Sequence, residues 1–187
     1  QDGTVDASSG NAELTLDGGA DSGSMTVENI ASDVDASAYT GTLTITSAAV
    51  DGSDDGDELT PVMDIITGTG DTVVSGDDSL DGDTDNLDIT VDGSQLAGTG
   101  NTLTLKGDAE FEITNDTVGE TLNLDISQIQ DDDELILVGS GDFRLTGTQA
   151  DIDASALSGA ITVETLSGDT STAINVTAGT GVTTVDA

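Results

Sequence analysis

The sequence predicts an all-β fold, a parallel β-solenoid in which short strands stack coil upon coil. The first observation is a head motif, an apolar residue followed by Asp and usually a small residue and Ser, at Val5, Val34, Val91, Leu124, Ile152 and Val185. The steps between the heads are 29, 57, 33, 28 and 33 residues, so the unit is about 30 residues long and the 57-residue step is a double one. A fixed period of this size is typical of stacked repeat proteins.

Composition is the second observation. The chain has 29 Thr, which together with Val and Ile favours pleated surfaces where branched side chains pack well. Its 24 Gly and 30 Asp favour tight turns. With two Phe, one Tyr and no Trp, the core must be aliphatic, and long helical patterns are absent.

The third observation is a series of short segments in which apolar and polar residues alternate, the pattern of a strand with one buried face. In chain order they are 13–16, 24–27, 42–46, 87–91, 102–105, 110–114, 121–126, 134–138, 160–164 and 173–177. Turns rich in Gly separate them at 68–71, 107–108, 139–142 and 179–181. The only proline, Pro61, interrupts the weakest repeat.

Two architectures fit this series within one domain, residues 1–187. An antiparallel β-sandwich with Ig-like strand spacing accounts for the turns every 8–12 residues or so. A solenoid, with one coil of two or three strands per repeat, better explains why the apolar-Asp head recurs with a small residue after it. We therefore expect the solenoid, with the sandwich as the alternative.

The charge is extreme, because 38 acidic residues face only Lys106 and Arg144, for a formal net charge of −36. Nucleic acid and anionic membranes are excluded as partners, since both require clustered basic residues. So much like charge destabilises a compact state unless cations offset it. Salt adaptation and bound calcium are both open explanations. The ratio of 30 Asp to 8 Glu favours calcium, because short Asp beside Gly suits loops that converge on a hard cation.

Catalysis finds little support in the residues. The chain has neither Cys nor His, which excludes disulfides, thiolate metal sites and Ser-His-Asp chemistry. Paired carboxylates can hydrolyse glycosides, but three aromatic residues leave few platforms for a sugar. No stretch is long and apolar enough to insert into a membrane. We therefore expect no enzyme, no catalytic residue and no organic cofactor.

The densest acidic run contains the strongest metal candidates. Asp81, Asp83 and Asp85 occupy positions one, three and five of a calcium loop, and Asp92 falls at position twelve, with Asp88 between them. A solvated acidic loop is the alternative. A second cluster with turn glycines, able to wrap an ion, contains Asp51, Asp54, Asp55 and Asp57.

Further carboxylates are candidates through their position in the repeat. Asp71 and Asp142 follow Gly-x-Gly turns at expected coil corners, where turn formation alone explains them nearly as well. The head aspartates Asp35, Asp92, Asp125 and Asp153 would form a vertical ladder if the heads stack. Such a ladder requires metal or hydroxyl partners, and the serine two residues after each head aspartate is a candidate.

The turns at 68–71 and 139–142, with the segments 152–163 and 178–185, resemble the calcium-dependent surface-layer proteins of Gram-negative bacteria, which are related to the repeats-in-toxin (RTX) secreted family. The resemblance implies a calcium-binding β-solenoid that is secreted without a cleaved signal peptide and assembles into a lattice on the bacterial surface. The chain contains no complete copy of the RTX nonapeptide, Gly-Gly-x-Gly-x-Asp-x-apolar-x.

Two function classes remain. One is a self-assembling extracellular structural protein, stabilised by Ca²⁺, whose partner is a second copy and, in a surface layer, cell-surface polysaccharide. The other is a repeat module of a large secreted adhesin. The repeat that begins at Val185 is unfinished, so we expect either a segment of a longer array or subunits that stack end to end. An ice-binding solenoid with flat Thr rows is a more distant third.

Overall fold

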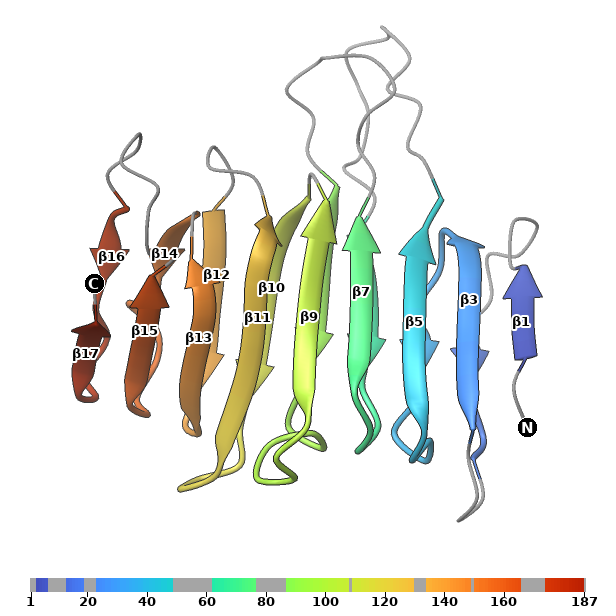
Figure 1. The fold of residues 1–187 in the computed structure, drawn as a ribbon, viewed down its shortest axis with the longest axis horizontal. Coiled ribbons are helices and arrows are strands. Elements are labelled where there is room, and N and C mark those ends of the chain that lie inside the picture. Colours follow the sequence, from blue (N-terminus) through green and yellow to red (C-terminus); the bar gives the residue numbers. More distant parts are fainter. Residues whose placement is uncertain are drawn as a thin grey trace, which may run out of the picture.

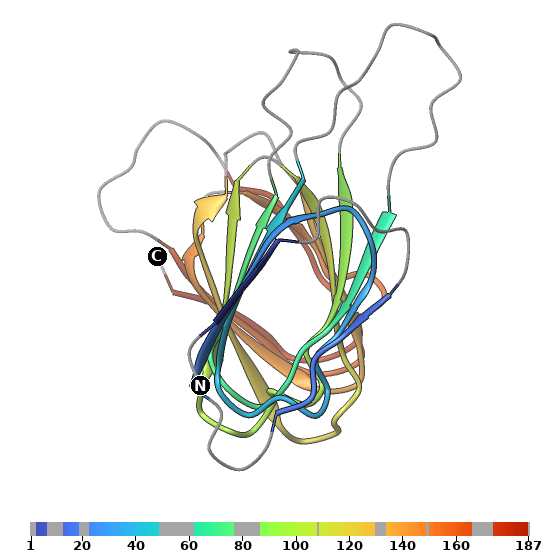
Figure 2. The same cartoon turned by 90° about the vertical axis from the view of Figure 1, so that its right-hand side faces the viewer.

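A computed structural model describes residues 3–6, 13–18, 23–48, 62–76, 87–107, 109–129, 134–148, 150–165 and 174–186. These residues form a parallel β-solenoid, as the repeat and the alternating segments predict (Figure 1). Every pair of neighbouring strands in it is parallel, which contradicts the alternative of an antiparallel sandwich. Seen along the solenoid axis, the strands of successive coils overlie one another in two facing layers (Figure 2).

The odd-numbered strands form one nine-stranded sheet, sheet A, and lie in front in Figure 1. Its members are β1 (Gly3–Asp6), β3 (Ser24–Ile30), β5 (Thr42–Ser47), β7 (Thr72–Gly76), β9 (Thr102–Gly107), β11 (Thr121–Ile129), β13 (Asp142–Thr148), β15 (Ile161–Thr165) and β17 (Thr183–Asp186).

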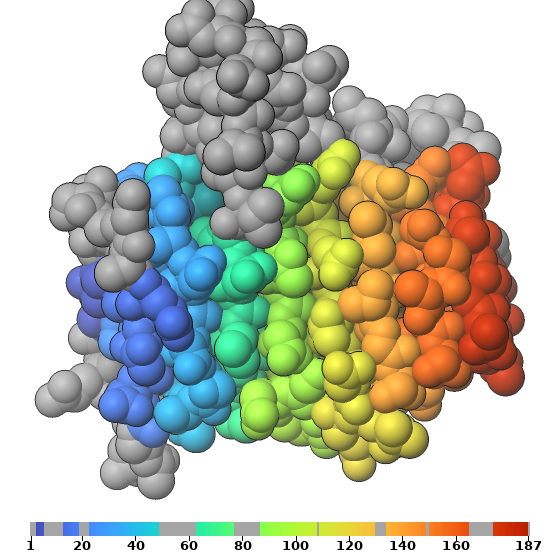
Figure 3. Space-filling view, turned by 180° about the vertical axis from the view of Figure 1, so that it is seen from behind, coloured from blue at the N-terminus to red at the C-terminus, as the bar shows by residue number. Residues whose placement is uncertain are grey.

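The even-numbered strands form sheet B, with eight strands, which lies behind sheet A in Figure 1 and faces the viewer in Figure 3. Its members are β2 (Leu14–Thr15), β4 (Val34–Asp35), β6 (Val62–Ile66), β8 (Asp88–Asp92), β10 (Glu110–Asn115), β12 (Glu134–Gly139), β14 (Asp151–Asp153) and β16 (Val176–Thr177). A coil is therefore one strand of each sheet.

The head motif and the coil have different periods. The coil is about 22 residues long, and hydrogen bonds between neighbouring coils join residues 18 to 32 apart. The head at Val91 lies on β8 of sheet B, whereas the next head, Leu124, lies on β11 of sheet A. The 33-residue step between them thus spans one and a half coils. The 30-residue unit seen in the sequence is therefore the spacing of a motif that occurs on strands of both sheets, and it is not the length of a coil.

The core lies between the two sheets and is built from stacked aliphatic rows. Leu103, Leu124 and Leu145 stand in one register of sheet A and are fully buried. In sheet B, Phe111 pairs with Ile89 on one side and Leu135 on the other. Burying one such side chain stabilises the fold by roughly 1.5–3 kcal/mol. The alternation of each strand places these residues inside and its polar residues outside.

Glycine is required where the corners of successive coils touch. A Cβ atom on Gly159 would collide with the carbonyl oxygen of Gly141, and one on Gly181 would collide with the carbonyl oxygen of Gly159. The recurring Gly-rich turns therefore form a stack in which only glycine lets the backbones approach. This close contact accounts for the glycines at these corners.

Among the strands that the structure describes, those at the two ends of each sheet have a single neighbour. β1 and β17 each have one neighbour in sheet A, and β2 and β16 each have one in sheet B. Val185 on β17 occupies the inward row beside the fully buried Val163, yet 51% of its surface is exposed. This apolar inward position is thus uncovered on the last coil that the structure describes.

Candidate cation-binding face

A row of carboxylates crosses the outer face of sheet B, one from each of four consecutive strands. Asp88 of β8 stands beside Glu110 of β10, and Glu134 of β12 stands beside Asp151 of β14. The pairing of Phe111 with Leu135 places Glu110 and Glu134, each one residue earlier, at neighbouring positions. Four acidic side chains therefore follow one another along the solenoid axis.

A second outward row lies two residues further along the same strands. It runs from Asp64 through Thr90 and Glu112 to Ile136 and Asp153. Both rows cross strands β8, β10, β12 and β14. Carboxylates therefore adjoin one another within the first row, and β10 and β14 carry one carboxylate in each row.

No basic side chain offsets this charge. Lys106 and Arg144 are the only basic residues of the chain, and they lie on β9 and β13 of sheet A. Arg144 there forms an exposed ion pair with Glu164, 2.7 Å between Nη2 and Oε1.

Neighbouring strands are about 4.8 Å apart. At about 4 Å, two like charges repel by about 1 kcal/mol in bulk water and by about 4 kcal/mol at an effective dielectric constant of about 20. The carboxylate row therefore has to be offset by protons or by cations from solution.

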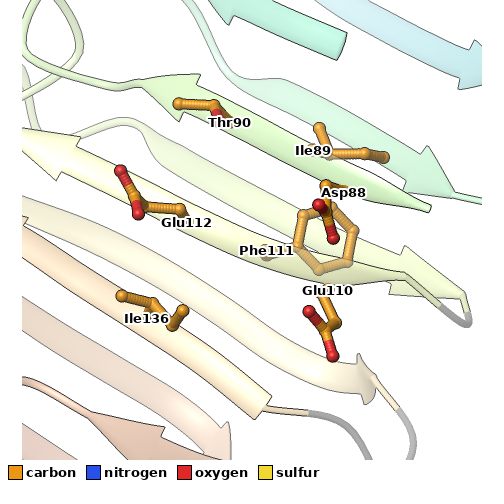
Figure 4. A pocket seen from close by; sticks show the side chains of 7 residues that line it. All are labelled: Asp88, Ile89, Thr90, Glu110, Phe111, Glu112 and Ile136. Atoms are coloured by element: carbon orange, nitrogen blue, oxygen red, sulfur yellow. The ribbon is translucent and has the colours of Figure 1, made fainter. Parts of the chain in front are cut away.

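A shallow pocket of about 170 Å³ opens beside the row (Figure 4). Asp88 and Glu110 lie close together at one end of it, and Glu112 lies at the other, pointing away from them (Figure 4). The lining residues come from three neighbouring strands of sheet B and are Asp88, Ile89, Thr90, Glu110, Phe111, Glu112 and Ile136.

The environment of Asp88 differs from that of Asp151 in the same row. Burial raises the pKa of Asp88, and the negative charge of Glu110 and a hydrogen bond with its carboxyl group raise it further. The pKa of Asp151 is lowered, because the Asn175 side chain and backbone N–H donate hydrogen bonds to its carboxylate. These bonds measure 2.8 Å from Nδ2 and 2.7 Å from the backbone nitrogen. The proton is therefore retained most readily at the Asp88 end.

The expected ladder of head aspartates is wrong. Asp35 and Asp92 share a register in sheet B, but Ile66 stands between them. Asp153 lies in the row of Ile136, and Asp125 lies in sheet A. The heads do not stack because their period is one and a half or two coils.

Each head aspartate instead forms a local turn with the serine two residues later, as the backbone N–H of the serine donates to its carboxylate. The distances are 2.9 Å for Ser37 to Asp35, 2.9 Å for Ser94 to Asp92, 3.1 Å for Ser127 to Asp125 and 2.8 Å for Ser155 to Asp153. Bonds from the Ser37 side chain and backbone lower the pKa of Asp35, and the Ser155 backbone and side chain do the same for Asp153. The serine is thus the hydrogen-bond partner of each of these aspartates, but within a single turn and not between stacked coils.

Asp71 and Asp142 join consecutive coils. Asp71 Oδ1 accepts the backbone N–H of Thr102 at 2.9 Å, and Asp142 Oδ1 accepts that of Ala160 at 2.7 Å. Both carboxylates thus satisfy a strand-start N–H of the next coil in sheet A. A ligand role for them stays a prediction.

The remaining predicted ligands, Asp51, Asp54, Asp55, Asp57, Asp81, Asp83 and Asp85, lie outside the described residues. Of the predicted set, Asp88 is the one that the described structure places beside another carboxylate in a pocket. No three acidic side chains converge closely enough to enclose a metal ion in the part of the chain that the structure describes. A cation bound at Asp88 and Glu110 would therefore need water or backbone oxygens to complete its ligand shell.

Reasoning from sequence missed Glu110, Glu112, Glu134 and Asp151 as members of one face. The signal was present, since Glu110-Phe-Glu and Asp151-Ile-Asp each alternate an acidic residue with a core residue. Only the register shows that these positions adjoin across coils.

Comparison of the chain with family models, with curated proteins and with solved structures gave no match. Among the residues described, no helix is long and apolar enough to cross a membrane. The fold and the acidic face therefore provide the basis for a functional proposal.

Proposed function

We propose that the chain is a structural repeat module that works outside the cell and assembles by continuing its coils from one copy to the next, with Ca²⁺ offsetting the charge of sheet B. The observation that carries the proposal is the parallel stacking of the coils, which lets a further coil continue both sheets in the same direction along the carboxylate row of sheet B.

An added coil would bury Val185 and extend sheet A beyond β17. At the other end, β1 presents Val5 in an inward row beside the buried Val27. Both edges are parallel strands of sheet A, so a second copy can continue the sheet without a change of direction. Unprotected strand edges recruit further strands unless something covers or charges them.

Calcium is the proposed counterion because it is a hard cation that binds several carboxylate oxygens at once. The pair Asp88 and Glu110 is the proposed starting point of its binding on sheet B. A ligand that binds only the folded state stabilises it by about 2.7 kcal/mol at a hundredfold excess over its Kd. Calcium would therefore support both folding and assembly.

The proposal gives the chain a location on the bacterial surface and a structural rather than catalytic role, in line with its resemblance to surface-layer proteins. Its main partner is a second copy of the chain. Cell-surface polysaccharide is the proposed anchor in a surface layer.

The first experiment follows circular dichroism and particle size as calcium is titrated into chelated protein, with magnesium and sodium chloride as controls. We expect β-structure and large particles to appear with calcium at millimolar concentrations or below. An equal response to sodium chloride would contradict a specific calcium role and make the acidity a salt adaptation.

The edge itself is tested by Val185→Asp. This change places a charge in the inward row of the end strand, so we expect particles to be lost while the circular dichroism spectrum is kept. The matched control is Val118→Asp, since Val118 is 78% exposed and lies in the turn before β11, away from both edges. Growth of Val185→Asp particles at the rate of the control would disprove edge-to-edge assembly.

The calcium site is tested by the double variant Asp88→Asn, Glu110→Gln, with Asp17→Asn as an exposed control. We expect the double variant to lose most of the calcium-induced rise in melting temperature and the control to keep it. An unchanged rise in the double variant would place the stabilising ions elsewhere.

The second candidate is an adhesin repeat, in which more coils of one long polypeptide cover the β17 edge. The same exposed Val185 supports it, because an intramolecular coil would bury that side chain equally well. Calcium-dependent folding of this chain without growth in particle size would favour the adhesin.

A further inference from the structure

Three adjacent strands of sheet A present two outward rows without a carboxylate. The strands are β5, β7 and β9, and the outward residues of these rows are Thr44, Thr46, Val73, Ser75, Thr104 and Lys106. The row before them, Thr42 and Thr102, contains the exposed Asp71, whose Oδ1 accepts the Thr102 N–H. Registers pair Thr44 with Val73 and Val73 with Thr104 across the three strands. We call this surface the neutral face.

The neutral face is unusual in a chain with 38 acidic residues and a net charge of −36. The sheet B strands of the same coils carry five outward carboxylates, namely Asp64, Asp88, Asp92, Glu110 and Glu112. Acidic residues return at the borders of the neutral face, with Glu28 on β3, Asp125 on β11 and Asp71 directly before β7.

The neutral face is also regular. The pairings of β5 with β7 and of β7 with β9 run without a shift in register. The pairings on either side, β3 with β5 and β9 with β11, both contain a shift. An uninterrupted register of short branched side chains gives an even surface that another even surface can meet.

We propose that the neutral face is the lateral contact between two copies of this chain, packed sheet on sheet. Copies with this net charge repel wherever acidic surfaces approach, and the neutral face is the region of the two sheets where that repulsion is smallest. Lys106 adds attraction, because it makes no ion pair with any described residue and can meet a border carboxylate, Glu28 or Asp125, of the second copy.

The contact is small, which determines how it works. Three strands about 4.8 Å apart and about five residues long cover roughly 240 Å². A stable interface buries about 800 Å² on each partner. One pair of faces therefore forms a weak, short-lived contact, and contacts repeated along stacked copies add up. The inference rests on the proposed assembly and adds a second direction to it.

The test uses single cysteines, since the chain has none of its own. Val73→Cys places a thiol at the centre of the neutral face. Thr90→Cys is the matched site on sheet B, and Thr146→Cys is a same-sheet control between Asp125 and Glu164. Each protein is treated with a short bis-maleimide, with and without calcium, and its cross-linking rate is divided by its rate of reaction with N-ethylmaleimide. Adding Thr44→Asp to Val73→Cys tests the role of charge.

We expect the normalised rate for Val73→Cys to exceed both controls at least tenfold, and Thr44→Asp to reduce it to the control level. Equal rates at the three sites would overturn the lateral contact. So would a monomeric Val73→Cys protein whose thiol is shielded by added neutral polysaccharide, because the face would then bind carbohydrate. Particle growth with calcium is measured separately without cross-linker, so failure of the end-to-end assembly is distinguishable from failure of this contact.

Discussion

Thr44 on β5 and Thr90 on β8 hold equivalent places, half-buried and facing outward, on the two sheets of neighbouring coils. Thr44 has Thr26 and Val73 beside it in its row, whereas Thr90 stands between Asp64 and Glu112. The same residue in the same backbone geometry is therefore in a neutral surface on one side and in an acidic one on the other. The interior sets the fold, and the outward positions are left to give each sheet its own chemistry.

The largest effect is expected where both sheets depend on the same feature, the corner between coils. Gly159→Ala places a Cβ atom against the carbonyl oxygen of Gly141, so the backbone of one coil has to move. We expect a loss of about 3 kcal/mol in the free energy of unfolding, measured by urea denaturation, with both sheets lost in one transition.

The matched control is Gly119→Asn. Gly119 has a φ of 77° and no atom within 4 Å of an added Cβ, and Asn tolerates left-handed backbone. We expect a change of less than about 1 kcal/mol. Equal losses in the two variants would mean that the corner glycines serve conformational freedom and not close packing.

The fold could be predicted because its signals are local. Segments such as 102–105 and 121–126 alternate buried and exposed residues, and the structure contains β9 and β11 there. The coil length could not be predicted, because the head motif occurs on both sheets. The distance between successive heads is therefore one and a half or two coils, and never one. Asp125 and Asp153 look alike in sequence yet lie on different sheets.

The acidic face could be predicted only in part. Asp88 is predicted from its acidic neighbours along the chain, but the carboxylate that stands beside it and raises its pKa is Glu110, 22 residues away. Such a pairing depends on register, and register in a solenoid depends on loop lengths that vary from coil to coil. The neutral face went unrecognised for the same reason, because Thr44, Val73 and Thr104 become one surface only after the coils close.

The same added charge is expected to cost more stability on sheet B than on sheet A. Thr90→Glu inserts a third carboxylate between Asp64 and Glu112, whereas Thr44→Glu inserts one into a neutral row. We expect Thr90→Glu to lower the free energy of unfolding by about 1–2 kcal/mol more than Thr44→Glu in chelator at low salt. Urea denaturation of both variants measures the difference.

Salt provides the control for that comparison. The Debye length falls from about 30 Å at 0.01 M to about 3 Å at 1 M ionic strength, so repulsion between exposed carboxylates is screened. The difference between the two variants should therefore shrink to a few tenths of a kcal/mol in 1 M salt. A difference that persists in high salt would come from packing instead of charge.

A smaller effect is expected from the pH dependence of stability, which should differ between the Asp88 end and the Asp151 end of the carboxylate row. The pKa of Asp88 is raised above 3.8, so the folded state holds the proton more tightly than the unfolded state. Its contribution to stability is full below pH 3.8 and is lost as pH rises through the raised folded value. In chelator at neutral pH, Asp88→Asn should therefore stabilise the protein by about 0.5–1 kcal/mol. The gain should disappear on acidification, as followed by urea denaturation across the pH range.

The smallest expected effect is a loss of stability, in contrast to the gain expected for Asp88→Asn. Asp151 has a lowered pKa, so its contribution is present above pH 3.8 and is lost as pH falls through the lowered folded value. Asp151→Ala removes the acceptor of the two Asn175 hydrogen bonds and should cost about 0.5 kcal/mol at neutral pH. That cost should fade only in stronger acid than the gain of Asp88→Asn does. If the change in unfolding free energy followed the same pH dependence in both variants, the carboxylates of the row would titrate together. Opposite profiles would show that the charge of Asp88 destabilises the fold by repulsion, whereas the carboxylate of Asp151 stabilises it as a hydrogen-bond acceptor. A cation that replaces a proton would then bind at the Asp88 end of the row.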